Sequence, residues 1–244
     1  MHRPHWHTYD AEIDESPARI TCDLAYFDRE LRSGSSTALL ILGAPLQEPT
    51  EAGLATEEES QTIANATSRI GESLPPTTLQ VGGWTAAGSW QVALYTPSDL
   101  NENLIPTLES IVKEGGWEMW IHAEPDPNWH HYETFLQPPT RTRLKAINDR
   151  ALTSLRRAGH DLTQPRKIAH KLSFPSREAA ELALSSLHLL GFEPTTPPKT
   201  RKDHYTTAQV QREDPPNVLP ALTEMLSEVC APLDGDHIKW IATS

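Results

Sequence analysis

Cysteine is scarce in this sequence, with two among 244 residues, Cys22 and Cys230. They lie far apart and lack the spacing of metal ligands, so we expect two small buried thiols in a reducing compartment rather than a disulfide framework. Long apolar runs are missing as well, because no segment approaches the roughly 20 apolar residues that a membrane-spanning helix needs. The N-terminal MHRPHWHTYD contains no apolar run either. We therefore expect a cytoplasmic protein with no membrane partner.

The sequence patterns of common active sites are also missing. It contains no nucleophile elbow, phosphate-binding loop or dinucleotide-binding glycine pattern. The stretch VGGWTAAG, which begins at Val81, is predicted to be a glycine-containing hairpin turn. No catalytic residue, cofactor or metal site is therefore predicted.

Basic residues are few in the first part of the chain. Residues 1–138 carry 6 Lys and Arg against 21 Asp and Glu (net −15), whereas residues 139–244 carry 15 against 12 (net +3). The change falls at QPPT, residues 137–140, where two prolines stop any helix and favour a boundary. We therefore predict two domains, 1–138 and 139–244, the first an acidic domain of unknown role.

The first domain shows a ββαββαβ pattern. Strands are predicted from short alternating or continuous apolar runs at 20–26, 37–42, 79–84, 90–95 and 117–123. Thr56 and Glu59 have the spacing of a capping box and open one predicted helix, and a second helix ends at Gly115 and Gly116. The fold class is therefore α+β, with an antiparallel sheet and helices on one face.

The second domain begins with a basic helix whose apolar stripe should leave its arginines, including Arg143, largely toward solvent. Gly159 is placed to end this helix and Pro165 to start a strand. A βαββαβ pattern follows, which is the ferredoxin-like order and again α+β. Its final helix should turn Val218 inward. His170 should lie on the inner face of the first strand, as a core histidine hydrogen-bonded to a backbone group.

The segment from Arg141 to Lys171 carries 9 Lys and Arg against two acids, Asp149 and Asp161. A solvated helix face and turn is the simple explanation. The alternative is a surface for an acidic partner or a polyphosphate. The candidate interaction residues are Arg156, Arg157, His160, Asp161, Arg166, Lys167 and His170.

The same segment carries a family resemblance. Gly159 to Arg166 has the run Gly-x-Asp-Leu-x-x-Pro-Arg, followed by His170, Phe174, the pair Ala179 and Ala180, and the pair Gly191 and Phe192. With these features, residues 141–240 resemble the regulator of ribonuclease activity B family, bacterial protein inhibitors of ribonuclease E. The resemblance implies a ferredoxin-like fold and a protein partner, for which a ribonuclease is the candidate. DPNWHHYETFLQP, at 126–138, resembles the domain-of-unknown-function family 695, which implies no activity.

A metal-dependent enzyme is one alternative. His122, Glu124, Asp126, His130, His131 and Glu133 have side chains that bind zinc. However, Trp129, Tyr132 and Leu136 have the spacing of a short packed helix, which Asp126 would cap. On such a helix the two neighbouring histidines point about 100° apart and do not converge. The structural interpretation is preferred.

An RNA-binding module is the other alternative, because ferredoxin-like sheets can present aromatic side chains to bases. The predicted third strand, which begins at His204, lacks alternating aromatics, and Tyr205 alone is insufficient. The net charge of −12 also opposes binding to phosphates. The sequence therefore predicts a non-enzymatic regulator that acts through protein contacts. Its oligomeric state and the identity of its partner stay open.

Overall fold

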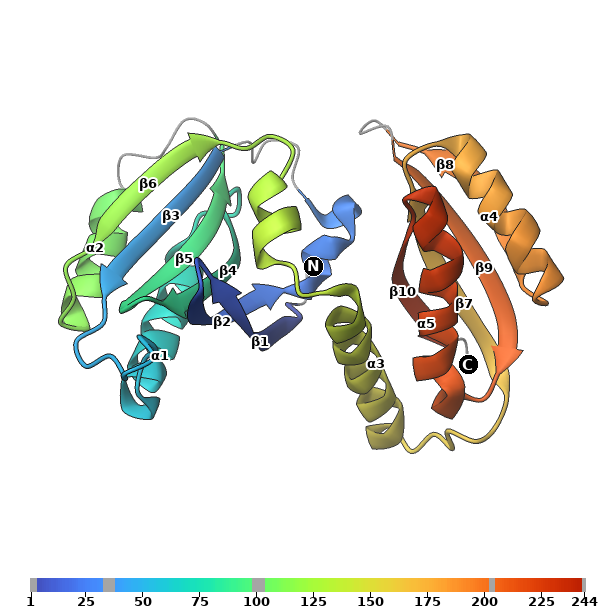
Figure 1. Cartoon of the computed structure of the whole chain (residues 1–244), viewed down its shortest axis with the longest axis horizontal. Helices are drawn as coiled ribbons and strands as arrows, with labels where there is room; N and C mark the ends of the chain where they lie inside the picture. Colours follow the sequence, from blue (N-terminus) through green and yellow to red (C-terminus); the bar gives the residue numbers. More distant parts are fainter. Residues whose placement is uncertain (1–3, 33–37, 98–103, 202–204, 243–244) are drawn as a thin grey trace. The chain divides into compact units, whose positions relative to one another are not determined.

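The computed structural model describes residues 4–32, 38–97, 104–201 and 205–242. The chain divides into two compact units, Met1–Pro138 and Pro139–Ser244 (Figure 1). Each unit is an antiparallel sheet with helices, so the predicted α+β class is confirmed for both. Within the described residues, no helix is both long and apolar enough to cross a membrane.

Unit 1 contains a six-stranded antiparallel sheet in the order β1-β2-β4-β5-β3-β6. Its strands are β1 (Trp6–Ile13), β2 (Ser16–Asp23), β3 (Ala38–Pro45), β4 (Leu79–Ala86), β5 (Ser89–Thr96) and β6 (Trp120–Pro125). The edge strand β1 was not predicted from the sequence. It forms a hairpin with β2 through a two-residue turn, in which Asp14 and Glu15 have φ of 49° and 65°. Positive φ at both residues is the geometry of tight hairpin turns.

Two helices, α1 (Glu57–Ser73) and α2 (Leu104–Glu114), pack on one face of this sheet. The side chain of Thr56 accepts a hydrogen bond from the Glu59 backbone N–H, as the capping box predicts. The Glu59 carboxylate, however, accepts from the backbone N–H of Gln47 (2.7 Å) and from the indole N–H of Trp117 (3.2 Å). Glu59 therefore ties the start of α1 to the loop after β3 and to the segment before β6. The shared core includes Leu40, Leu42, Ala66, Ile70, Val92, Leu94, Leu108 and Val112.

The opposite face of the sheet is covered by residues 126–136, which end in the short π-helix η3 (Tyr132–Leu136). The rings of Trp129 and Tyr95 stack with their centroids 4.0 Å apart. The Tyr95 hydroxyl donates to Asp126 (2.5 Å), and the Asp126 carboxylate also accepts from the backbone N–H groups of His130 and His131. The buried Asp126 carboxylate therefore holds residues 126–136 on the sheet. Two short 3-10 helices, η1 (Leu24–Phe27) and η2 (Arg29–Leu31), follow β2.

Unit 2 follows the order βαββαβ after an initial helix, α3 (Thr140–Arg157). Its sheet has the order β10-β7-β9-β8. The other elements are β7 (Arg166–Phe174), α4 (Arg177–Leu189), β8 (Glu193–Thr200), β9 (Thr206–Asp214), η4 (Pro216–Val218), α5 (Leu219–Cys230), η5 (Ala231–Leu233) and β10 (Asp236–Ala242). All three helices contribute apolar side chains to the core on one face of the sheet. Figure 1 shows α5 in front of this sheet, running roughly along its strands.

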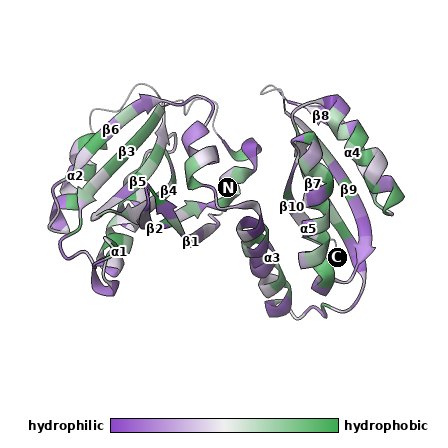
Figure 2. Cartoon of the chain, viewed as in Figure 1, coloured by the Kyte–Doolittle hydropathy of each residue, from purple (hydrophilic) through white to green (hydrophobic). Residues whose placement is uncertain are grey.

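Helix α3 is mostly hydrophilic (Figure 2). Two predictions from the sequence, one about this helix and one about the final helix, were wrong. Arg143 is buried rather than exposed, because its guanidinium donates to the Asp236 carboxylate of β10 at 2.9 Å. Val218 is exposed rather than buried, because η4 rather than the final helix contains it and Leu219 is the first residue of α5. Leu144 and Leu152 are buried, and Ile147, Ala151 and Leu155 pack against the core beside them.

Candidate functional site

The turn between α3 and β7 has a defined shape. Gly159 has φ of +78°, a conformation that glycine adopts without the steric cost that other residues meet. The Asp161 carboxylate accepts from the backbone N–H and from the hydroxyl of Thr163, both at 2.8 Å. The backbone hydrogen bond from Thr163 is the main reason that the pKa of Asp161 is lowered. Asp161 therefore shapes the turn, and its side chain stays exposed and charged.

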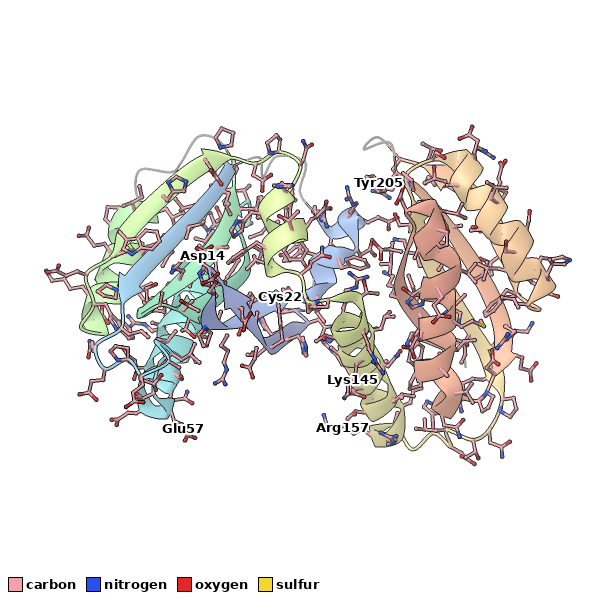
Figure 3. All side chains as sticks on the ribbon, in the orientation of Figure 1. Asp14, Cys22, Glu57, Lys145, Arg157 and Tyr205 are labelled. Atoms are coloured by element: carbon pink, nitrogen blue, oxygen red, sulfur yellow. The ribbon has the colours of Figure 1, made fainter. Side chains whose placement is uncertain are left out.

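Basic side chains flank this turn. Arg156 is exposed in the last turn of α3, as is Arg157 (labelled in Figure 3), and Lys167 is exposed near the start of β7. Arg166 is half-buried and donates to the backbone carbonyl of Asp161 at 3.2 Å. We refer to Arg156, Arg157, Arg166 and Lys167 as the α3–β7 basic surface. His160 is exposed beside it.

Acidic residues of the neighbouring strand border the basic surface. In the pairing of β7 with β9, Arg166 lies opposite Asp214 and Lys167 opposite Glu213. Asp214 already accepts two hydrogen bonds from Arg212, at 2.8 and 3.0 Å. Arg156 and Arg157 lie on α3, outside this strand pair, so neither stands opposite Asp214 or Glu213 in the sheet.

His170 is not part of the exposed surface. It is fully buried on β7, and its Nδ1 lies 3.1 Å from Nε2 of the buried His237 on β10. The sequence prediction of a buried core histidine holds, but the predicted backbone partner was wrong, because the partner is a second imidazole. Burial lowers the pKa of His170 to about 4, and it lowers the pKa of His237 as well. Both rings are therefore neutral near pH 7, and neither offers a positive charge to a partner.

Other buried polar groups tie α3 to the core. The Asn148 side chain donates to the Thr223 hydroxyl of α5 and accepts from the indole N–H of Trp240 on β10, both at 2.8 Å. Neither the link of Asn148 to Trp240 nor the pairing of His170 with His237 was predicted from the sequence. The available signal was the position of Asn148 one turn from both Leu144 and Leu152, on the side of α3 that packs inward.

The residues of the metal alternative do not form a common site. His122 and Glu124 are exposed on the edge strand β6, while Asp126 is buried and accepts hydrogen bonds from the Tyr95 hydroxyl of β5 and from two backbone N–H groups of its own segment. The His131 ring packs against Trp84 and Phe135, and burial lowers its pKa. Across the described ranges, no three His, Cys, Asp or Glu side chains gather closely enough to hold a metal ion.

Unit 1 has an open groove of about 720 Å³ between α1 and the strands β1, β2 and β4. Its lining is mainly apolar and hydroxyl side chains, with few charges. Of the charged lining residues, Arg19 pairs with Asp10 at 3.0 Å, and Asp23 accepts backbone hydrogen bonds from His5 and Ala25. Neither His nor Cys is found among the described residues that line the groove.

The geometry defines a two-unit α+β protein in which a βαββαβ unit carries an exposed basic turn. Residues 145–240 match the family described as regulator of ribonuclease activity B, and residues 4–137 match a family of unknown function, DUF695. The DUF695 match spans more than half of the chain, so the chain belongs to the DUF695 family. Both resemblances noted in the sequence are thus confirmed.

Two solved structures are similar over most of the chain. One is an unknown protein from Galdieria sulphuraria, with 11% identity over 85% of this chain and 99% of that chain, and a TM-score of 0.24. The other is a putative glycine cleavage system transcriptional repressor, with 10% identity over 85% and 98% and a TM-score of 0.27. No curated protein matches the chain. At these TM-scores the likeness supports no conclusion about function.

Proposed function

We propose that this chain is a non-enzymatic cytoplasmic regulator that modulates a ribonuclease through protein contacts. The observation that carries the proposal is the match of residues 145–240 to a family of ribonuclease regulators. In this proposal, residues 139–244 are the ribonuclease-regulating domain of ferredoxin-like fold, and residues 1–138 are an acidic accessory domain. Within the described residues, the lack of converging ligands and the hydrogen-bonded state of Asp126 favour binding over catalysis.

The α3–β7 basic surface is the proposed contact for an acidic segment of the partner. Arg156 and Arg157 are exposed, and Arg166 is held in place by the turn carbonyl. Arginine suits carboxylate partners, because its planar guanidinium can donate two parallel hydrogen bonds. Long-range attraction by these charges should weaken as added salt shortens the Debye length, which is about 8 Å at physiological ionic strength.

The test is a double charge reversal, Arg156→Glu with Arg157→Glu, assayed for inhibition and binding of purified ribonuclease E. We expect the fold to persist, since both side chains are exposed, and binding to fall at least tenfold. The matched control is Arg141→Glu with Lys145→Glu, which makes the same charge change on exposed residues of the same helix. Equal loss in both variants would indicate a general charge effect, and loss in neither would remove the surface from the proposal.

RNA binding is the second candidate function, favoured only by the exposed basic residues. On β7 and β9, the sheet face opposite the helices carries small or polar side chains such as Lys171, Thr207 and Gln209, with no aromatic platform for bases. Retention of RNA by the purified protein at moderate salt, lost in the Arg156→Glu and Arg157→Glu variant, would favour this candidate over the protein partner.

A further inference from the structure

Helix α4 exposes leucines on the side that faces away from the core. Leu189 is 87% exposed and Leu182 is 60% exposed, whereas Ala180, Ala183 and Leu187 of the same helix are buried. With 100° of rotation per residue, the two leucines lie close to the pole opposite the buried stripe. A surface helix normally places charged or polar residues there. The two leucines therefore need an explanation outside the core of their own unit.

Two serines lie between the leucines on the same face. Leu182, Ser185, Ser186 and Leu189 have the spacing i, i+3, i+4, i+7, and we call these four residues the α4 stripe. The Ser185 hydroxyl donates to the carbonyl of Glu181 at 2.9 Å, and the Ser186 hydroxyl donates to that of Leu182 at 3.3 Å. The serine hydroxyls bond to the helix backbone. The stripe is therefore uncharged, with small side chains in the middle and apolar side chains at both ends.

The order of residues in the α4 stripe is the same in both directions, Leu-Ser-Ser-Leu, with its midpoint between Ser185 and Ser186. We propose that the α4 stripe is a self-association surface, on which a second copy of this chain binds with its α4 antiparallel to the first. A two-fold axis through the midpoint places Leu182 of each copy on Leu189 of the other. A two-fold interface requires such a self-complementary surface. The small serines let the two helices approach where they cross.

The flanking charges fit the antiparallel arrangement. Glu178 and Glu181 lie near the N-terminal end of α4, where Arg177 pairs with Glu181, and His188 lies in its last turn. Antiparallel packing brings Glu181 of one copy beside His188 of the second copy and sets the two helix dipoles antiparallel, with the N-terminus of each helix beside the C-terminus of the other. A parallel arrangement would instead bring like charges of the first turns together.

The neighbouring edge of the sheet offers no competing route to self-association. Strand β8 is the edge strand beside α4, and its prolines, Pro194, Pro197 and Pro198, have no backbone N–H to donate to an added strand. Edge-to-edge pairing of two copies is therefore blocked on this side. The exposed area of the α4 stripe is small, so the association should be weak and concentration-dependent.

The first test measures sedimentation velocity of the full chain up to about 200 μM, a range in which contacts of small area become populated. We expect a reversible monomer–dimer equilibrium that Leu182→Gln with Leu189→Gln weakens at least tenfold. Glutamine keeps the helix propensity close to that of leucine, so the fold should persist. The control is Ile241→Gln, at an exposed apolar residue of β10. Wild-type protein that stays monomeric throughout, or a dimer unchanged by the leucine variant, overturns the proposal.

A cross-linking test fixes the geometry. In the proposed dimer, the two cysteines of the Ser186→Cys variant would lie about 1.5 Å apart along the helix axes, because the helix rises about 1.5 Å per residue. The two cysteines of the Glu178→Cys variant would lie about 22 Å apart along the same axes. Both positions are exposed, and the native Cys22 and Cys230 are buried. Mild oxidation should yield a disulfide-linked dimer only for Ser186→Cys. Equal cross-linking of the two variants would mean random collision, and a dimer linked only through Glu178→Cys would mean a different interface.

Discussion

His170 and His237 face each other in the core of unit 2, with 3.1 Å between Nδ1 of His170 and Nε2 of His237. One imidazole donates and the other accepts. The outward nitrogens, Nε2 of His170 and Nδ1 of His237, are buried and have no hydrogen-bond partner in the part of the chain that the structure describes. A proton added to either ring would therefore place an unpaired charge in an apolar core, which costs several kcal/mol unless the structure opens.

The first prediction is that unit 2 loses stability as the pH falls. Burial lowers the pKa of His170 to about 4 from 6.5. His170 therefore binds a proton near pH 6.5 in the unfolded chain, but only near pH 4 in the folded unit. Stability is fully present above pH 6.5 and declines through this interval, by up to about 3 kcal/mol from His170 alone. Urea unfolding between pH 7.5 and 4.5, followed by the signal of a fluorinated Trp240, measures the decline.

A non-titrating replacement tests the cause. His170→Gln should lower stability at pH 7.5 but flatten its dependence on pH, because the group that resists protonation has been removed. The exposed His160 provides the matched control, since His160→Gln should leave the slope unchanged. The same slope in wild type and His170→Gln would assign the acid sensitivity to His237 or to carboxylates instead.

The second prediction concerns the polar link between α3 and the core. Asn148→Ala removes the acceptor of the buried Trp240 Nε1–H and the donor to the buried Thr223 hydroxyl, which still donates to the Pro220 carbonyl. The unpaired indole N–H together with the lost bond to Thr223 should lower the free energy of unfolding of unit 2 by roughly 2–4 kcal/mol. Asp149→Ala, next in the chain, breaks only the exposed pair with Lys145 and should cost less than about 0.5 kcal/mol. Urea midpoints of the two variants at pH 7.5 provide the comparison.

The elements that could be predicted from the sequence are those built on local signals. The Thr56 cap, the positive φ of Gly159 and the Ser176 hydroxyl that caps α4 follow from chemistry within a few residues. The buried positions of β7 follow from simple alternation. Strand β1 was missed because its exposed face is polar and its pairing with β2 is set by a hairpin turn that carries neither Gly nor Asn.

The polar contacts could not be predicted, because their partners lie far along the chain. Arg143 is buried only because Asp236, 93 residues away, accepts its hydrogen bond. In β10, strict alternation would place His237 and Trp240 on opposite faces. A bulge between His237 and Lys239 shifts the register, so both contact buried groups of the same core. A bulge of this kind leaves no local signal in the sequence.

The third prediction is that chelators leave the melting temperature unchanged after metal-free purification. His122 and Glu124 are exposed on β6, and the Asp126 carboxylate is occupied by the Tyr95 hydroxyl and two backbone N–H groups. A metal held by so few converging ligands would add little stability. Calorimetry with and without EDTA measures the effect. Stoichiometric zinc in the purified protein, lost on replacing His122 or His131, would instead support the alternative of a metal-dependent enzyme.

The fourth prediction isolates the conformation of Gly159 from its packing. Apart from its chain neighbours, a Cβ atom built on Gly159 would meet no atom of the described residues within 4 Å, so a substitution there should cost only what the left-handed backbone costs. Gly159→Val should therefore lower the free energy of unfolding by roughly 1–2 kcal/mol, because a β-branched residue strongly resists φ near +78°. Gly159→Asn should cost clearly less, since asparagine tolerates this conformation. Thermal unfolding of both variants tests the order. Equal costs for valine and asparagine would mean that the left-handed backbone at Gly159 does not set the cost of a side chain there.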